Sequence, residues 1–142
     1  MVADESDILV PRKILLVEDD LLLAGMFEKN LKSANYSVTT VYDGGQVHDL
    51  VKQHLFDLVF LDIRLPNKDG FTILKEIKND PKTKNVPVIM ITNLGEVEHM
   101  DRALRLGAAD YVIKANTTPK AIRALANKHL IHFTARSNTE RD

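Results

Sequence analysis

The sequence predicts an α/β protein in which helices cover both faces of a parallel sheet. Two observations carry this prediction. Five short segments rich in apolar and β-branched residues alternate with segments whose apolar residues recur at helical spacing. Strands that are joined through helices pair in parallel, and right-handed crossovers place the helices on the faces of the sheet. The chain has 142 residues, enough for one domain with its own core.

Composition and charge exclude several classes of protein. The chain is 44% hydrophobic and 27% charged, as soluble globular proteins are. Its net charge of −1 gives no field that favours nucleic acid or an anionic membrane, and no apolar run is long enough to span a bilayer. The absence of cysteine excludes disulfides and thiolate metal sites and fits a reducing compartment. We therefore expect a soluble, cytoplasmic protein whose partners include neither nucleic acid nor a membrane.

The chain divides into a domain and two polar ends. Residues 1–11 contain three acidic residues and end at a proline, which predicts a flexible acidic tail. The domain is expected over 12–133. From residue 134 the composition turns polar, so 134–142 is expected to be a flexible C-terminal tail. Neither end is long enough for a second domain, and we expect the domain to stand alone without an output domain.

The first half of the domain contains two strands and two helices. The first strand is expected over 13–17, before the acidic run Glu18-Asp19-Asp20. The helix after it has one face made of Leu23, Phe27, Asn30 and Leu31, and Met26 lies beside that face. The second strand, over 36–42, is β-branched and aromatic and is broken by Asp43-Gly44-Gly45. The second helix is marked by the spacing of Val47, Leu50 and Val51.

The second half continues the alternation. A third strand near 57–62, with a compact apolar run that stops on Asp62, leads into a loop shaped by Pro66 and Gly70. A helix over about 70–79 follows, and its inward residues are Ile73, Leu74 and Ile77. The fourth strand covers 87–91, and the helix over 95–106 is closed by Gly107 and buries Val97, Met100 and Leu104. After a fifth strand over 109–113, Thr118-Pro119 opens a helix with an apolar stripe of Ile122, Leu125, Ala126, His129, Leu130 and Phe133.

Polar side chains fall at the ends of four strands. Glu18 and Asp19 follow strand one, and strands three, four and five end on Asp62, Thr92 and Lys114. The carboxyl ends of parallel strands share one edge of the sheet, so these side chains can converge. Three carboxylates around one point need a cation, and an all-oxygen set with room for water suits Mg²⁺. Because a lysine and a hydroxyl suit phosphoryl oxygens, the combination predicts phosphoryl transfer.

Each of these residues has an ordinary structural explanation when it is considered alone. The run Glu18-Asp19-Asp20 suits a helix N-cap with acids that favour the helix dipole. Asp62 could cap the turn toward Pro66, Thr92 could be a satisfied strand-end hydroxyl, and Lys114 could be a solvated charge. The appearance of such residues at the ends of four strands is what favours a site.

The same residues lie in motifs that resemble the receiver domain of two-component response regulators, in particular the single-domain chemotaxis regulators. The resemblance covers 13–133, about 85% of the chain, and its spacings are thirty residues from Asp62 to Thr92 and fifty-two from Asp62 to Lys114. It implies a doubly wound, flavodoxin-like (βα)5 sheet with strand order 2-1-3-4-5. The matching motifs are Leu16-Val17-Glu18-Asp19-Asp20, Leu61-Asp62-Ile63-Arg64-Leu65-Pro66 with Gly70, Met90-Ile91-Thr92, Gly107-Ala108-Ala109-Asp110-Tyr111 and Ile113-Lys114.

The resemblance implies a chemical role for each matching residue. Asp62 would accept a phosphoryl group from the phosphohistidine of a sensor histidine kinase or a phosphotransfer protein. Asp19 and Asp62 would ligate Mg²⁺ directly, Glu18 through a water, and Arg64 through its backbone carbonyl. Lys114 would pair with a phosphoryl oxygen. The chain would then be a phosphoprotein of a phosphorelay, and not an enzyme beyond slow autophosphatase activity.

The resemblance also implies a switch. Thr92 would move its hydroxyl toward the phosphate, and Tyr111 would turn into the space that Thr92 leaves. The surface made by the fourth strand, fourth helix, fifth strand and fifth helix would then change for a downstream protein target, which is a population shift driven by added charge. The fourth helix, fifth strand and fifth helix could also pair two copies as a homodimer. By itself, Tyr111 could equally be a half-buried strand aromatic.

Several positions depart from the family pattern. Ala115 follows Lys114 where the family has a proline in a cis bond, which predicts either a strained cis Lys114–Ala115 bond or a rearranged loop. Asn93 is larger than the residue usual after Thr92 and could crowd the phosphate or bond to it. Arg64 and Leu94 occupy positions that tune the lifetime of the phosphate. Leu94 cannot orient an attacking water, so slow self-dephosphorylation is expected.

The sequence is also compatible with features of two other functions. A receiver-like interaction module without phosphorylation is compatible with Ala115 and Asn93. A Mg²⁺-dependent phosphohydrolase with an aspartyl-phosphate intermediate would need an acid two residues after the nucleophile, where this chain has Arg64. His129 and His132 are three residues apart, but no carboxylate accompanies them in the sequence, and His129 is better explained by packing.

Overall fold

The computed structural model describes residues 10–93 and 97–141. Its first half contains β1 (Lys13–Val17), α2 (Leu21–Ser33), β2 (Ser37–Val41), the short 3₁₀ turn η2 (Gly44–Gln46) and α3 (Val47–Gln53). The second half contains β3 (Leu58–Asp62), α4 (Gly70–Asn79), β4 (Val88–Thr92), α5 (Val97–Arg105), β5 (Asp110–Ile113), the 3₁₀ turn η3 (Lys114–Asn116) and α6 (Pro119–Arg141). The predicted alternation of strands and helices is confirmed.

The five strands form one parallel sheet with the order β2-β1-β3-β4-β5, as predicted. The register sets the strand ends side by side. Val17 of β1 lies opposite Leu61 of β3, and Thr92 of β4 lies opposite Ile113 of β5. Because the ends are aligned, the residues that follow each strand emerge together at one edge of the sheet.

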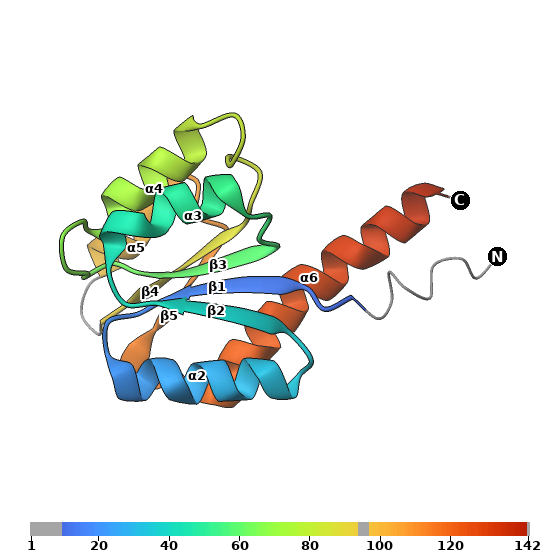
Figure 1. Cartoon of the computed structure of the whole chain (residues 1–142), viewed down its shortest axis with the longest axis horizontal. Coiled ribbons are helices and arrows are strands. Elements are labelled where there is room, and N and C mark those ends of the chain that lie inside the picture. Colours follow the sequence, from blue (N-terminus) through green and yellow to red (C-terminus); the bar gives the residue numbers. More distant parts are fainter. Residues whose placement is uncertain (1–9, 94–96, 142) are drawn as a thin grey trace.

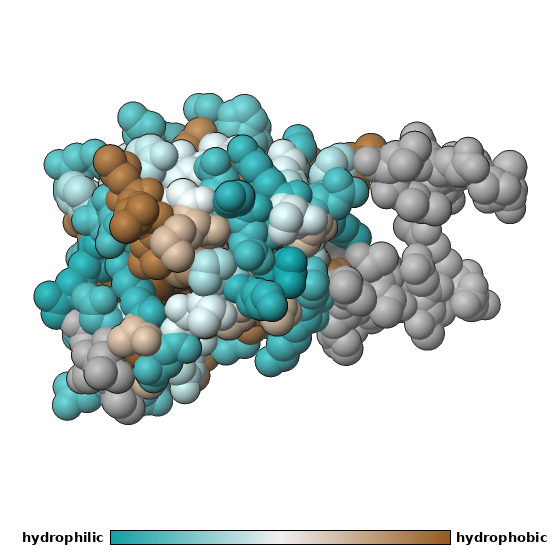
Figure 2. Space-filling model, turned by 90° about the horizontal axis from the view of Figure 1, so that it is seen from below, coloured by the Kyte–Doolittle hydropathy of each residue, from teal (hydrophilic) through white to brown (hydrophobic). Residues whose placement is uncertain are grey.

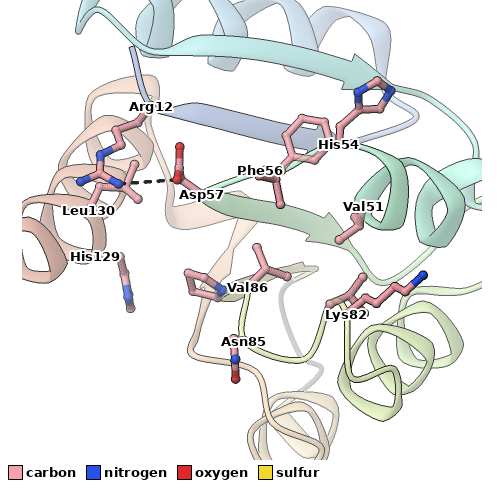
Figure 3. Close-up of a pocket in the computed structure, with 13 residues that line it drawn as sticks. Arg12, Val51, His54, Phe56, Asp57, Lys82, Asn85, Val86, His129 and Leu130 are labelled. Carbon is pink, nitrogen blue, oxygen red and sulfur yellow. Dashed lines mark ion pairs between the residues drawn. The ribbon is translucent and has the colours of Figure 1, made fainter. Parts of the chain in front are cut away.

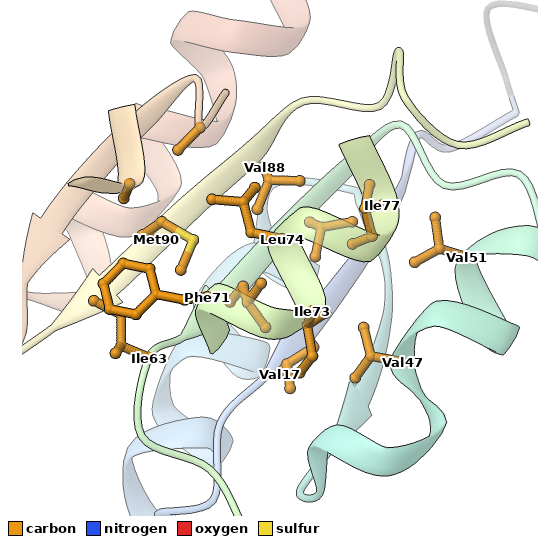
Figure 4. Packing of buried hydrophobic residues seen from close by; sticks show 14 of the residues in the cluster. Val17, Val47, Val51, Ile63, Phe71, Ile73, Leu74, Ile77, Val88 and Met90 are labelled. Carbon is orange, nitrogen blue, oxygen red and sulfur yellow. The ribbon is translucent and has the colours of Figure 1, made fainter. Parts of the chain in front are cut away.

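The helices lie in two layers, one on each face of the sheet (Figure 1). Helices α2 and α6 pack on one face, through a cluster that includes Phe27, Leu31, Ile122 and Ala126. Helices α3, α4 and α5 cover the other face, where Ile73, Leu74 and Ile77 of α4 pack against the strands (Figure 4). Strands β1, β3 and β4 supply apolar side chains to both layers, which is why their sequences are continuously apolar.

Side-chain caps begin three of the helices. The Asp20 carboxylate accepts a hydrogen bond from the Leu23 amide at 3.1 Å, and Asp69 accepts one from the Thr72 amide at 3.0 Å. Thr118 caps α6 by accepting from the Ala121 amide at 3.1 Å, as predicted. Gly107, with φ of +107°, closes α5 in the left-handed region that glycine tolerates. These caps account for the loops that separate helices from strands.

The buried positions differ from the predicted ones in two helices. In α5, Leu104 was expected inside but is 44% exposed, whereas Ala103 is fully buried. The helix lies close to the sheet, and the small side chain of Ala103 suits the closest position better than a leucine does. In α2, the buried Ala24 was not predicted, and Met26, which the sequence placed beside the apolar face, is 45% exposed. Val97 lies among the residues whose side chains the structure does not describe.

Helix α6 is longer than predicted. The sequence suggested a helix ending at 133 and a flexible tail over 134–142, but the helix continues to Arg141. Residues 134–141 are polar, and they contain no proline or glycine that would end a helix. Figure 1 shows the last turns of α6 extending past the sheet. In the part of the chain that the structure describes, no helix has the length and apolar character needed to cross a bilayer.

Candidate functional site

The predicted site residues meet at the carboxyl edge of the sheet. Since Val17 lies opposite Leu61, the next residues, Glu18 and Asp62, face each other across two neighbouring strands. Both are almost completely buried, at 0% and 1% exposure. Lys114 follows β5 and reaches back toward both of them. The structure therefore brings together side chains that lie 44 and 52 residues apart in the sequence.

Lys114 is shared between the two buried carboxylates. Its Nζ lies 2.8 Å from Asp62 Oδ2 and 3.0 Å from each carboxylate oxygen of Glu18. Burial by itself disfavours the ammonium, but the hydrogen bonds and charges of Asp62 and Glu18 outweigh burial and raise the pKa of Lys114. The lysine is thus a fixed positive charge within reach of the proposed phosphoacceptor.

Glu18 has an unusual electrostatic environment. Burial and the adjacent Asp62 carboxylate together raise the pKa of Glu18 to about 8, against the opposing effect of Lys114. Its Oε1 lies at ion-pair distance from Lys114 Nζ, yet has no hydrogen-bond partner among the described residues. A single lysine therefore does not satisfy this acidic site.

The acidic residues can accommodate a cation. One carboxylate oxygen from each of Glu18, Asp19 and Asp62 lies within 4.8 Å of the other two. Asp19 is exposed to solvent, so water can complete a coordination shell. Oxygen ligands with retained waters are what Mg²⁺ prefers. The unpartnered oxygen of Glu18 and this donor set both fit a hard divalent cation.

The loop after β3 is fixed tightly around Asp62. The Arg64 amide donates to Asp62 Oδ1 at 3.2 Å, and the Gly70 amide donates to the Ile63 carbonyl at 2.7 Å. A Cβ at Gly70 would lie 2.4 Å from the Asp62 carbonyl oxygen, so only glycine fits there. This packing keeps the backbone of Arg64 beside the carboxylates, while its side chain is exposed.

The two predicted switch residues lie on neighbouring strands. Thr92 is 1% exposed, and its hydroxyl has a long contact of 3.5 Å to the Asn93 carbonyl oxygen. Tyr111 lies opposite Met90 in the sheet and packs, half-buried, against the cluster under α3, α4 and α5. Both residues are thus placed next to the edge that carries Asp62, with Tyr111 on the α5 side.

The structure decides between the two predicted conformations of the Lys114–Ala115 bond after β5. The Lys114–Ala115 bond is trans, and Lys114 still reaches Asp62, so the strained cis alternative was wrong. The loop forms η3 instead, and the Thr117 hydroxyl donates to the Ile113 carbonyl at 2.7 Å. Asn93 is exposed. Leu94 lies outside the described residues.

Comparison with known families identifies the chain. Residues 14–126 match the family model of the response regulator receiver domain. The chain belongs to this family. Receiver domains are signalling domains of two-component systems, and both the fold and the strand-end residues described above agree with that assignment.

Curated relatives of this receiver are longer proteins. The DNA-binding dual master transcriptional regulator RpaA of Synechocystis sp. is 35% identical over 72% of this chain and 42% of its own length. The phosphate regulon transcriptional regulatory protein PhoB of Rhizobium meliloti is 34% identical over 76% of this chain and 48% of its own length. The chain thus spans under half the length of these relatives. Because the name of RpaA describes a DNA-binding protein, this comparison does not support the expectation that nucleic acid is absent from the partners.

Solved structures give the same fold. NtrX from Brucella abortus has a TM-score of 0.81 and 25% identity, over 93% of this receiver and 29% of that chain. The receiver domain of the sensor histidine kinase PA1611 from Pseudomonas aeruginosa has a TM-score of 0.76 and 28% identity, over 84% and 98% of the two chains. The latter structure has a magnesium ion coordinated in its active-site cleft.

A groove beside the receiver's acidic cluster was not predicted. It has a volume of about 660 Å³ and runs from Asp19 and Arg64 to α5, where Phe71 contacts His99 and Arg102. The His99 ring meets Phe71 edge-on at 5.4 Å, and the Arg102 guanidinium lies 4.3 Å above the Phe71 ring. Helical periodicity could place these residues on α4 and α5, but it could not show that they meet at the site.

A second cavity, of about 440 Å³, lies at the opposite end of the receiver's sheet (Figure 3). Its walls come from segments that are far apart in the sequence and include Arg12, Phe56, Val86 and Leu130. Arg12 pairs with Asp57 at 3.5 Å at one side. None of the predicted site residues lines this cavity, so it is separate from the acidic cluster.

The start of α2 exposes an apolar patch next to the acidic cluster. Leu21, Leu22 and Met26 are 68%, 77% and 45% exposed, immediately after Asp19 and Asp20 in the chain. Figure 2, which views the α2 side of the receiver, shows apolar residues gathered at the corresponding end of this face. Exposed apolar patches of this kind often mark contact surfaces for other proteins.

Proposed function

We propose that this chain acts as a response regulator receiver in the cytoplasm, in which Asp62 accepts a phosphoryl group from the phosphohistidine of a sensor histidine kinase or a phosphotransfer protein. The observation that carries the proposal is the environment of Asp62. Its buried carboxylate lies 2.8 Å from Lys114 and shares an edge with two further carboxylates. An acceptor, a cation-binding set and a fixed positive charge are the components that phosphoryl transfer requires.

The transfer step involves one bond formed and one broken. An Asp62 carboxylate oxygen bonds to phosphorus while the phosphorus–nitrogen bond of the donor breaks. The electron pair of that bond leaves with the histidine nitrogen, and the imidazole is neutral because its other ring nitrogen keeps its proton. Lys114 exchanges its contact with the carboxylates for a phosphoryl oxygen. The product on this chain is an acyl phosphate.

The acidic residues would hold Mg²⁺. Asp19 and Asp62 would provide direct carboxylate ligands, Glu18 would act through a water, and the Arg64 backbone carbonyl would complete the protein's share. The bound ion supplies neutralisation of the charge on the phosphoryl oxygens. Because Glu18 is buried next to Asp62, it would lose its proton when the cation binds.

Phosphorylation would bias a switch. Thr92 would turn its hydroxyl to the new phosphoryl oxygens, and Tyr111 would move toward the space it leaves. The surface of β4, α5, β5 and α6 would then favour a downstream protein target or the next phosphotransfer protein, or pair two copies through α5, β5 and α6. Arg64 and Leu94 would set the lifetime of the phosphate, with slow self-dephosphorylation as the chain's only catalytic activity.

Acetyl phosphate and Mg²⁺ provide the test. The wild-type chain should gain one phosphoryl group, detected by intact mass, and Asp62→Asn should gain none. Asp49→Asn, an exposed residue on α3, serves as a control for the loss of one acidic charge and should behave as wild type. Absence of modification with acetyl phosphate, and also with a phosphorylated histidine donor, would favour the unphosphorylated interaction module. Rapid release of inorganic phosphate with turnover would favour the phosphohydrolase.

A further inference from the structure

Among the strands of the described residues, β2 is the one whose carboxyl end contributes no side chain to the proposed phosphoacceptor site. The residues after it nevertheless contact both halves of that site. On one side, the Glu18 amide donates to the carbonyl of Val41, the last residue of β2, at 3.0 Å. This bond anchors the backbone of the first acidic residue to β2 at the point where β1 ends.

On the other side, the turn after β2 holds the loop that follows Asp62. The Gly44 amide donates to the Pro66 carbonyl at 3.2 Å. The Asn67 side-chain amide donates to Asp43 Oδ2, while Asp43 Oδ1 accepts from the Gly45 amide at 2.6 Å. Each carboxylate oxygen of Asp43 is therefore occupied, one by its own turn and one by the loop after β3.

The contact is close enough to require particular residues. A Cβ at Gly44 would lie 2.2 Å from the Lys68 carbonyl oxygen and 2.9 Å from Ile73 Cδ1. Asn67 has φ of +69°, a conformation that asparagine and aspartate tolerate better than most residues do. The loop thus adopts an uncommon backbone conformation at the position where Asp43 holds it.

We infer that Asp43, Gly44 and Asn67 form a clasp that positions the loop after Asp62 for cation binding and phosphoryl transfer. This inference rests on the proposed function of Asp62 and adds positioning residues to it. Asp43 touches no reacting atom; it acts through Asn67, and Gly44 acts through Pro66, on the segment that carries the Arg64 backbone. Outer residues of this kind commonly affect cation affinity because they fix the ligands.

The clasp adds to the other contacts of this loop. Those contacts include the Arg64 amide to Asp62 Oδ1 at 3.2 Å, the Asp69 cap of α4 and the ion pair of Lys68 with Glu76 at 2.9 Å. They hold the start of the loop and its α4 side, whereas the clasp holds its middle, Pro66 and Asn67, from β2. When the clasp is absent, the Arg64 carbonyl samples more positions, and binding a cation must order it again. The clasp removes that cost before the cation arrives.

The test compares Asp43→Ala, Asn67→Ala and the exchanged pair Asp43→Asn with Asn67→Asp. In the exchanged pair, residue 43 still accepts from the Gly45 amide and now donates to residue 67. Mg²⁺ affinity is measured by calorimetry and the phosphorylation rate with acetyl phosphate. Each alanine variant should lower Mg²⁺ affinity about tenfold, the low end of what outer residues of metal sites contribute, and the exchanged pair should recover most of that loss.

A measurement without Mg²⁺ separates positioning from stability. Amide exchange at Lys68 and Gly70 should become faster in the alanine variants, while exchange at the buried strand residue Phe60 stays unchanged. Asp49→Ala controls for the loss of one acidic charge and should match wild type. Unchanged Mg²⁺ affinity in Asp43→Ala, or a lowered affinity that the exchanged pair does not restore, would refute the clasp. If wild type itself neither binds Mg²⁺ nor becomes phosphorylated, the proposed function fails and the clasp fails with it.

Discussion

Glu18→Gln should stabilise the metal-free protein even though it removes a proposed site residue. Glutamine has nearly the same shape as glutamate but carries no charge. Glu18 is completely buried beside Asp62, and its pKa is raised to about 8 from the usual value of 4.5. Folding therefore requires this group to take up a proton at neutral pH. Lys114 keeps its contact with Asp62 at 2.8 Å in the variant, so the lysine is not left unpaired.

The magnitude follows from proton linkage. An acid whose pKa is raised on folding makes its full contribution to the free energy of unfolding below its unfolded pKa. That contribution is lost as the pH rises from the unfolded pKa through the folded pKa. Between the unfolded value of 4.5 and pH 7 lie about 2.5 pH units, each worth about 1.4 kcal/mol, which gives a ceiling of about 3.5 kcal/mol at pH 7. The neighbouring Asp19 is exposed and water screens the site, so we expect about 1 to 2 kcal/mol.

Urea unfolding of both proteins between about pH 5 and about pH 8, without divalent cations, provides the assay. The wild-type free energy of unfolding should fall across this range relative to the variant, and the two curves should meet toward the acidic end. Mg²⁺ should stabilise the wild type more than the variant, because only the wild type has the Glu18 carboxylate charge that the cation offsets. Parallel curves, or a variant less stable than wild type at pH 8, would refute the electrostatic argument.

Five further substitutions test other parts of the structure by urea unfolding. Lys114→Met should destabilise the metal-free protein by about 2 to 4 kcal/mol, because two buried carboxylates lose their common partner; an unchanged midpoint would contradict the ion-pair geometry. Leu74→Ala should lower the free energy of unfolding by about 3 kcal/mol, and Leu104→Ala, at a half-exposed position, by less than about 1 kcal/mol. Equal losses would contradict the outward position of Leu104 on α5. Gly44→Ala should destabilise by about 1 to 3 kcal/mol, since its Cβ meets a backbone oxygen at 2.2 Å. Gly25→Ala, in a helix with open space around it, should stabilise by about 0.5 to 1 kcal/mol, and a loss there would show an unseen contact.

The parts of the fold that could be predicted are those that local sequence determines. The apolar runs of β1, β3 and β4 identify buried strands, and Thr118 and Gly107 mark helix ends through their own backbone chemistry. The meeting of the strand-end side chains could be predicted because parallel strands bring their carboxyl ends to one edge. Glu18, Asp62 and Lys114 follow from that rule without any knowledge of distances.

Features that depend on contacts between distant segments could not be predicted. The choice of Ala103 over Leu104 for the core depends on how closely α5 approaches the sheet, which periodicity does not specify. The bond from Asn67 to Asp43 joins two loops whose residues look like ordinary turn formers in the sequence. The end of α6 was misplaced because polar composition was taken to mean an irregular tail, although nothing in 134–141 prevents a helix.

The site of this receiver combines negative charge with burial, two features that oppose each other energetically. Glu18 and Asp62 are buried where a carboxylate is least favourable, and one lysine is shared between them. That arrangement is poor for the stability of the empty protein, as the raised pKa of Glu18 indicates. It is favourable for binding a cation and a phosphoryl group, since both bring charges that the empty site lacks. Because Lys114 cannot serve two carboxylates and a phosphoryl oxygen equally, the phosphorylation proposed for Asp62 would redistribute the contacts of Lys114. The edge of the sheet that holds β5 is therefore where we expect a change at Asp62 to be transmitted first.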